Sequence, residues 1–120
     1  LTKVGCKYSQ EHRYEEGYYD CSSLVQRLYQ EVGISLPAIA STQGEFMVTH
    51  GLEVTEGELE PGDLIFYSYE QNGQFRNISH VAIYVGNGRM VHAANSRRGV
   101  VNDPFNPSNI GLYGRPSRLQ

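Results

Sequence analysis

Residues 20–33 read Asp-Cys-Ser-Ser-Leu-Val-Gln-Arg-Leu-Tyr-Gln-Glu-Val-Gly, and the fold can be worked out from this stretch outward. Its apolar residues recur every three or four positions, which is the spacing of one face of a helix. Asp20 offers a side-chain oxygen that can cap the first turn, and Gly33 can end the helix. The stretch therefore predicts a helix over about 21–32, whose apolar face must be buried against another layer.

Downstream of this helix the pattern changes from helical to strand-like. Pro37 prevents a simple continuation, and we expect a second short helix that is capped by Ser41 or Thr42 and ends at His50-Gly51. Short apolar runs between turn residues then predict strands. They are Leu64–Tyr67, Ile78–Val85, Met90–Ala94, Gly99–Val101 and Tyr113–Leu119. For residues 1–19 we expect mostly loop with a short helical start. Helices followed by strands predict an α+β fold, with N-terminal helices packed on an antiparallel β-sheet.

Composition bounds the class of protein. A chain of 120 residues, 39% hydrophobic and 19% charged, is typical of one globular domain, which we expect to span residues 1–120. The net charge is −3 and the longest basic run is Arg97-Arg98, so we expect no nucleic-acid partner. The longest apolar run, Val81–Val85, is far shorter than the roughly 20 residues of a membrane span. The first residues do not resemble a signal peptide, so we expect neither a membrane span nor a signal in this segment.

Three side chains form a candidate catalytic set. Cys21 lies in the first turn of the predicted helix, where free N–H groups favour a thiolate and should lower the pKa of its thiol. His80 and His92 lie on two predicted strands, and histidine moves protons near neutral pH. Taken singly, each has a plainer interpretation as a buried cysteine or a half-buried histidine. Together they predict a cysteine hydrolase in which Cys21 attacks, His80 is the general base and acid, and His92 orients His80.

Whether the two histidines can meet depends on the loop between their strands. A two-residue turn at Asn87-Gly88 would place His80 and His92 on opposite faces of the hairpin. A three-residue loop, Gly86-Asn87-Gly88, pairs Ala82 with His92 and places both histidines on one face. We therefore predict the three-residue loop.

Two other uses of these residues stay open. Cys6 is expected to be a structural thiol, but a Cys6–Cys21 disulfide would remove the nucleophile. A zinc site made of Cys21, His80 and His92 is also conceivable, although the chain has none of the short ligand spacings typical of zinc sites.

Four segments, residues 20–25, 59–66, 78–86 and 88–93, resemble the NlpC family of cell-wall cysteine peptidases in their order and spacing. The resemblance extends over about residues 5–105. It implies a papain-like domain without a cofactor that hydrolyses peptidoglycan stem peptides, between D-glutamate and a diamino acid such as diaminopimelate or lysine. In this resemblance Cys21 matches the nucleophile, His80 the base and His92 the third, orienting residue.

The resemblance also implies substrate-binding residues. Tyr8 matches a tyrosine near the nucleophile and is the candidate for a second oxyanion donor beside the N–H of Cys21. Asp20 and Ser22 match positions that in some members bind the free amino end of a stem peptide. The chain departs from the family at Ser23, where glycine is usual, and at residues 9–12, where Ser-Gln-Glu-His replaces Trp-Gly-Gly. The second departure changes a loop expected to border the cleft, and so bears on substrate preference.

The resemblance further implies a secreted or wall-associated protein. We expect this chain to be a segment of a larger exported protein, to act as a monomer and to take a stem peptide as its partner. Two other functions remain possible for the same fold. One is an inactive wall-binding module, and the other is an amidase or acyltransferase acting on another amide or ester. The complete set of one cysteine and two histidines favours the peptidase.

Overall fold

The structure, a computed structural model, describes residues 3–119. Within them the helices are α1 (Cys21–Glu31) and α2 (Ala40–Thr49), and short 3-10 helices span Glu56–Glu58, Phe75–Asn77 and Pro116–Arg118. The strands are β1 (Lys7–Tyr8), β2 (Tyr18–Tyr19), β3 (Glu53–Val54), β4 (Leu64–Tyr67), β5 (His80–Gly86), β6 (Arg89–Asn95), β7 (Gly99–Pro104) and β8 (Ile110–Gly114). No helix in this part of the chain is long and apolar enough to cross a membrane.

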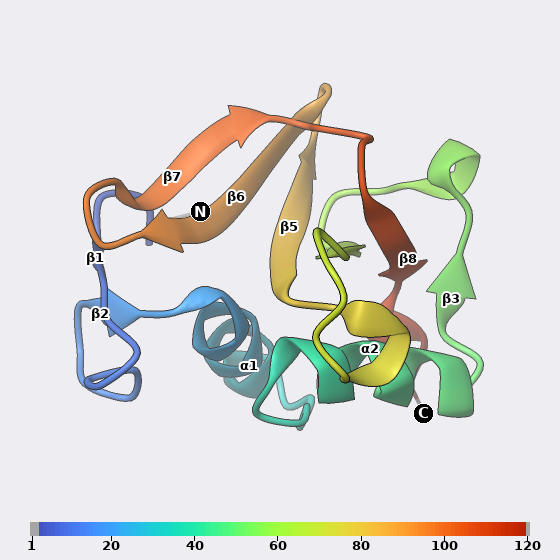
Figure 1. Cartoon of the computed structure of the whole chain (residues 1–120), viewed down its shortest axis with the longest axis horizontal. Coiled ribbons are helices and arrows are strands. Elements are labelled where there is room, and N and C mark those ends of the chain that lie inside the picture. Colours follow the sequence, from blue (N-terminus) through green and yellow to red (C-terminus); the bar gives the residue numbers. More distant parts are fainter. Residues whose placement is uncertain (1–2, 120) are drawn as a thin grey trace.

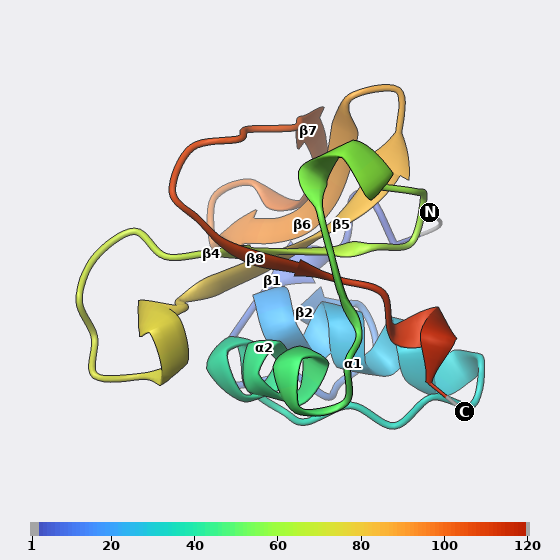
Figure 2. The same ribbon diagram turned by 90° about the vertical axis from the view of Figure 1, so that its right-hand side faces the viewer.

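One sheet carries most of the fold. Its strand order is β3-β8-β4-β5-β6-β7, and every neighbouring pair is antiparallel. The two helices lie together against one face of this sheet (Figures 1 and 2). The predicted α+β fold, with the early helices packed on an antiparallel sheet, is therefore confirmed.

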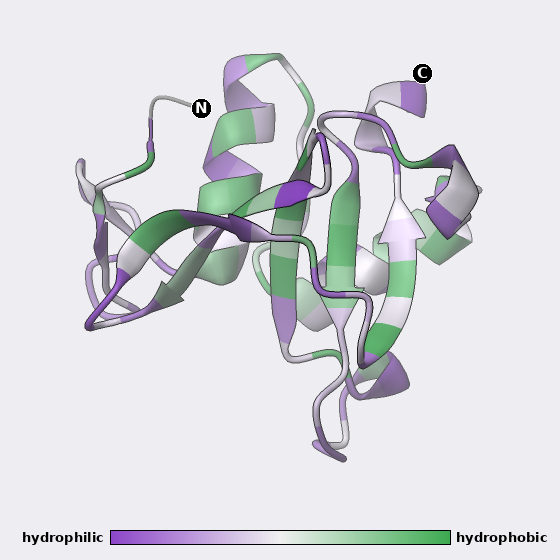
Figure 3. Ribbon diagram, turned by 90° about the horizontal axis from the view of Figure 1, so that it is seen from above, coloured by the Kyte–Doolittle hydropathy of each residue, from purple (hydrophilic) through white to green (hydrophobic). Residues whose placement is uncertain are grey.

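Two hydrophobic clusters bury the central strand, β4, on both of its faces. On the helix side, Leu64 and Phe66 of β4 share a cluster with Val25 of α1 and Met47 of α2. On the other side, Ile65 belongs to a second cluster made of strand residues and the segments beside them. In Figure 3 the hydrophobic colour is accordingly concentrated on the inner strands and on α1. A strand buried on both faces consists of an unbroken run of apolar residues, and such a run predicted the strand Leu64–Tyr67.

The two helices begin with different N-terminal caps. The side chain of Asp20 accepts the N–H of Ser23 at 2.8 Å, and the Ser23 hydroxyl accepts the N–H of Asp20 at 2.9 Å. This reciprocal cap confirms the predicted start of α1 and gives Ser23, the departure from glycine, a role in holding the backbone beside Cys21. The prediction for α2 was wrong at its start, because Ile39 is the cap and Thr42 donates its hydroxyl to the Ile39 carbonyl at 2.9 Å.

The N-terminal segment does not contain the predicted short helix within residues 3–19. It forms the short parallel pair β1-β2 instead, and Gly5 and Cys6 exchange backbone hydrogen bonds with Val100 of β7, each at 2.9 Å. Because these groups are already paired with β7, they are not available for a helix. The segment is thereby attached to the edge of the sheet nearest to α1 (Figure 1).

The last predicted strand, Tyr113–Leu119, was wrong at both ends, because β8 runs from Ile110 to Gly114. Strand β8 ends at Gly114 and pairs with both β4 and the unpredicted short strand β3. Pro116 then begins a 3-10 helix. Proline has no N–H to contribute to a strand ladder, and this accounts for the earlier end of the strand.

Candidate active site

A polar pocket of about 200 Å³ lies at the N-terminus of α1. Five of the six residues singled out in the sequence line it, and these are Tyr8, Asp20, Cys21, Ser22 and His80. Gln10, from the loop that departs from the family pattern, also lines the pocket, so this loop borders it as expected. The sixth residue, His92, is buried behind His80 and bonded to it.

Cys21 is the first residue of α1. Its own N–H has no hydrogen-bond partner within residues 3–119, as expected for the start of a helix. Burial raises the pKa of the Cys21 thiol to about 11, against the opposing effect of the nearby N–H groups of Val81 and Ser22. The expected lowering of this pKa was therefore wrong, because burial outweighs the helix terminus. Cys6 and Cys21 are both free, so the alternative disulfide is absent.

The hairpin of β5 and β6 brings the two histidines onto one face by a route that the sequence did not predict. The loop is a two-residue turn at Asn87-Gly88, with Gly86 paired to Arg89, so the predicted three-residue loop was wrong. The register then shifts between Tyr84 and Gly86, which inserts one extra residue into β5. This bulge restores the pairing that a three-residue loop would have given, and the predicted shared face is confirmed. Asn87 and Gly88 both have positive φ, as a tight hairpin turn requires.

A chain of hydrogen bonds runs across three adjacent strands from the pocket. Nε2 of His80 lies 2.8 Å from Nδ1 of His92, and Nε2 of His92 lies 2.8 Å from Oδ2 of Asp103 on β7. The guanidinium of Arg98 binds both oxygens of Asp103, at 2.6 and 2.9 Å. The Arg98 hydrogen bonds lower the pKa of Asp103 to about 2, so this carboxylate is ionised at neutral pH.

The ionised carboxylate fixes the tautomer of both histidines. A carboxylate only accepts, so a neutral His92 must carry its proton on Nε2 and present Nδ1 as an acceptor. His80 must then donate from Nε2, which leaves a lone pair on its Nδ1. The chain that ends at Asp103 therefore prepares Nδ1 of His80 to accept a proton.

The protonation states favour this role. Burial, together with the neighbouring His92, lowers the pKa of His80 to about 4, so its imidazole is neutral at pH 7. The Cys21 thiol, with its raised pKa, is neutral as well. The pair can act as a thiol beside an imidazole, with proton transfer accompanying attack rather than preceding it.

Asp103, Arg98 and Arg13 belong to this site but were not singled out as site residues in the sequence. Asp103 lies 11 residues from His92, beyond the predicted end of its strand, and Arg98 lies in the turn before that strand. Extending the strand would have found Asp103, because it lies two positions beyond Val101, which pairs with His92. Tyr69, an exposed residue whose ring lies 6.3 Å from the ring of His80, was not singled out either. Tyr67, whose ring stacks on that of Tyr69, is fully buried.

The alternative zinc site has no geometric support. Across the described residues, no group of three His, Cys, Asp or Glu side chains is arranged so that it could hold a metal ion. The histidines bind each other and Asp103 through the nitrogens described above.

Several known proteins are similar to this chain. A γ-D-glutamyl-L-lysine dipeptidyl-peptidase of Bacillus cereus is 33% identical over 101 residues, 83% of this chain and 28% of that protein. The structure of NlpC2 from Trichomonas vaginalis superposes with a TM-score of 0.80 at 30% identity, covering 95% of this chain and 42% of that one. The peptidoglycan hydrolase RipB from Mycobacterium tuberculosis superposes with a TM-score of 0.74 at 26% identity, covering 96% of this chain and 59% of that one.

The match extends over nearly the whole chain, although the chain spans only about a quarter of the Bacillus cereus protein. Residues 5–110 match the model of the NlpC/P60 family. This chain therefore belongs to the NlpC/P60 family.

Proposed function

We propose that this domain is a cysteine peptidase that hydrolyses peptidoglycan stem peptides at the bond between D-glutamate and the diamino acid. One observation carries the proposal. The thiol of Cys21 shares a pocket with His80, whose free Nδ1 is fixed by the chain through His92 and Asp103. Two relatives, a γ-D-glutamyl-L-lysine dipeptidyl-peptidase and a peptidoglycan hydrolase, support the substrate class.

In the first half of the reaction, Nδ1 of His80 accepts the thiol proton as Sγ of Cys21 attacks the carbonyl carbon of the D-glutamyl amide. The carbonyl oxygen takes the negative charge and is stabilised by the unpaired N–H of Cys21 and the hydroxyl of Tyr8. The C–N bond then breaks, and protonated His80 gives its proton to the departing amine of the diamino acid. A thioester between Cys21 and the D-glutamyl group remains.

In the second half, His80 removes a proton from a water molecule that attacks the thioester. The C–S bond breaks, the D-glutamyl carboxylate is released, and the proton on His80 returns to the thiolate of Cys21. His92 and Asp103 are positioning residues, because they act through His80 and do not touch the reacting atoms. Burial of the site keeps His80 available as a neutral base in both halves.

The chain supplies its own control for the test, because it has two free cysteines. Defined tri- and tetrapeptide stems, with lysine or diaminopimelate, are incubated with the wild type, Cys21→Ala and Cys6→Ala, and the products are identified by mass spectrometry. We expect cleavage at the D-glutamyl bond by the wild type and by Cys6→Ala, and none by Cys21→Ala.

Two results would overturn the proposal. Cleavage by Cys21→Ala would mean that another group is the nucleophile. No cleavage by any of the three proteins would favour the wall-binding module or an amidase or acyltransferase with another substrate. Trapping of a Cys21-linked acyl group from another amide or ester would identify the latter.

The setting of the domain follows from the same proposal. We infer that the domain is a segment of a larger exported protein, that it acts outside the cell or at the wall, and that it works as a monomer on single stem peptides. No cofactor takes part in the steps given above.

A further inference from the structure

The pocket beside Cys21 contains an ion pair at the place where the family resemblance implied a site for a substrate amine. Arg13 and Asp20 are the charged side chains that line it, since His80 is neutral at pH 7. Nε of Arg13 lies 3.0 Å from Oδ2 of Asp20, and their side chains are only 21% and 12% exposed. The acid that would receive a substrate cation is therefore already paired with a cation of the protein.

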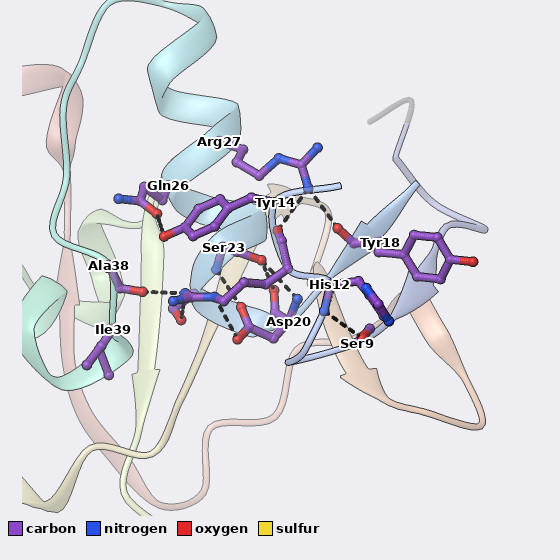
Figure 4. Close-up of polar contacts among 12 residues, drawn as sticks. Ser9, His12, Tyr14, Tyr18, Asp20, Ser23, Gln26, Arg27, Ala38 and Ile39 are labelled. Carbon is purple, nitrogen blue, oxygen red and sulfur yellow. Dashed lines mark hydrogen bonds and ion pairs between the residues drawn. The ribbon is translucent and has the colours of Figure 1, made fainter. Parts of the chain in front are cut away.

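The other groups around Asp20 are also occupied. Its Oδ1 accepts the N–H of Ser23 at 2.8 Å, so both carboxylate oxygens have partners. Nη2 of Arg13 donates to the hydroxyl of Ser22 at 2.9 Å and to the carbonyl of Ala38. Figure 4 shows Asp20 and Ser23 hydrogen-bonded to each other, and a hydrogen bond to the carbonyl of Ala38. Both residues expected to hold an amino end are thus engaged by Arg13.

The loop that carries Arg13 is fixed independently of the substrate. Nη1 of Arg27, on α1, donates to the backbone carbonyls of Arg13, Glu15 and Tyr18 at 3.0, 3.2 and 2.7 Å. The guanidinium of Arg13 also lies over the ring of Tyr14, with its central carbon 5.0 Å from the ring centroid. Arg13 is therefore held in the pocket wall by its backbone as well as by its side chain.

We infer that Arg13 is a specificity-determining residue that excludes stem peptides with a free, protonated amino end and favours stems whose amino end is acylated. The inference rests on the proposed function. An ammonium group would find Asp20 already paired and would face a guanidinium of the same charge. An acylated amino end carries no charge and has a carbonyl oxygen. Nη1 of Arg13, which has no hydrogen-bond partner within residues 3–119, can donate to that oxygen. Stems still joined to the glycan are acylated in this way.

The test compares two substrates that differ only at this end. The tripeptide L-Ala-γ-D-Glu-L-Lys is offered with a free and with an acetylated α-amino group at pH 7, where the free amine is mostly protonated. We expect the wild type to cleave the acetylated peptide with a kcat/KM at least about tenfold higher, as repulsion between two like charges in a partly buried site predicts. Arg13→Gln should bring this ratio close to one, mainly through faster cleavage of the free peptide.

Two further variants separate charge from structure. Arg13→Lys keeps the positive charge and should keep the preference for the acetylated peptide. Arg97→Gln removes an exposed arginine outside this pocket and should leave the ratio unchanged. A merely structural role for Arg13 would lower cleavage of both peptides equally in Arg13→Gln and leave the ratio at its wild-type value.

The outcomes distinguish this inference from the proposed function. Equal cleavage of both peptides by the wild type, or faster cleavage of the free one, would overturn the inference and leave the peptidase in place. No cleavage of either peptide would overturn the peptidase itself and the inference with it. The wild-type ratio decides the question even if Arg13→Gln fails to fold.

Discussion

The two walls of the pocket beside Cys21 are built by different means. One, the strand wall, consists of His80 with His92 and Asp103 behind it, on the adjacent strands β5, β6 and β7. The other, the loop wall, consists of residues 7–20, in which the only strands are the two-residue β1 and β2, and Arg27 holds it to α1. Backbone pairing fixes the geometry of the strand wall, whereas a few long side chains fix that of the loop wall.

This difference teaches where each kind of change should act. A one-residue slip in the register of the strand wall would turn a histidine side chain to the opposite face of the sheet. Proton transfer through the two histidines therefore depends on the strand register. The loop wall can change its side chains without disturbing any extended strand pairing. We therefore expect substitutions in the strand wall to lower kcat, and substitutions in the loop wall to alter substrate choice and KM.

The largest effect should come from breaking the strand wall at Asp103. Asp103→Asn can donate to Nε2 of His92, which reverses the tautomer of both histidines and puts a proton on Nδ1 of His80. We expect kcat to fall about 10³-fold, roughly 4 kcal/mol, with little change in KM. Nitrogen NMR of the histidine rings should show the change of tautomer. An unchanged tautomer with full activity would contradict the role given to Asp103.

The second effect concerns stability and comes from the buried base. The pKa of His80 is about 4 in the folded protein, against an ordinary value of 6.5. As the pH falls below 6.5 the unfolded chain takes up a proton that the folded chain does not, so stability is lost between pH 6.5 and about pH 4. The expected loss is about 3 kcal/mol.

Denaturant unfolding of the wild type and of His80→Gln across this pH range measures that loss. The variant cannot titrate at this position, so the difference between the two proteins isolates His80. For the same reason, kcat/KM of the wild type should hold down to about pH 5 and fall as His80 becomes protonated near pH 4. Parallel stability curves for the two proteins would show that His80 titrates normally.

The strand wall and the loop wall also differed in how far the sequence could predict them. Alternation along strands placed His80 and His92 on one face, since that conclusion needs only the register. The bulge that gives this register was missed, because a two-residue turn with an inserted residue and a three-residue loop lead to the same pairing at the histidines. Asp103 was missed because its strand was predicted to end too early, at Val101.

For the loop wall, the sequence indicated the residues but not their partners. The resemblance assigned Asp20 and Ser22 to a substrate amine, while nothing local to Arg13 indicates that its side chain reaches them. Such contacts depend on how an irregular loop folds back, and no periodicity encodes that. The pKa of Cys21 was predicted in the wrong direction for a similar reason, because burial by the whole domain outweighs the local effect of the helix end.

The third effect should come from substituting Arg27, which weakens the loop wall and leaves the strand wall unchanged. Arg27 donates to three backbone carbonyls, and its guanidinium carbon lies 4.1 Å from the centroid of the Tyr19 ring. We expect Arg27→Met to lower the free energy of unfolding by about 2 kcal/mol, because these carbonyls lose their donor. KM should rise a few-fold while kcat stays close to the wild-type value. For Arg27→Lys, the free energy of unfolding and KM should lie between those of the wild type and Arg27→Met. A fall in kcat without a rise in KM would show that the loop wall and the strand wall do not act separately.

The smallest effect should come from the outer end of the strand wall, at Arg98. Its guanidinium binds both oxygens of Asp103, but its side chain is 42% exposed, so water can replace much of the contact. We expect Arg98→Ala to lower kcat only about fivefold and to leave KM unchanged. The pKa of Asp103 should rise from about 2 toward its ordinary 3.8, which carbon NMR of the carboxylate can follow.

Arg97→Ala is the matched control, because the side chain of Arg97, which precedes Arg98, is exposed and makes no hydrogen bond within residues 3–119. It should change neither kcat nor the pKa of Asp103. If Arg98→Ala were instead as damaging as Asp103→Asn, the carboxylate alone would be unable to hold His92, and the positioning chain would have to include the guanidinium. A fivefold effect would mean that Asp103 holds His92 largely without help from Arg98. The pairing of β6 with β7 already fixes the position of this carboxylate.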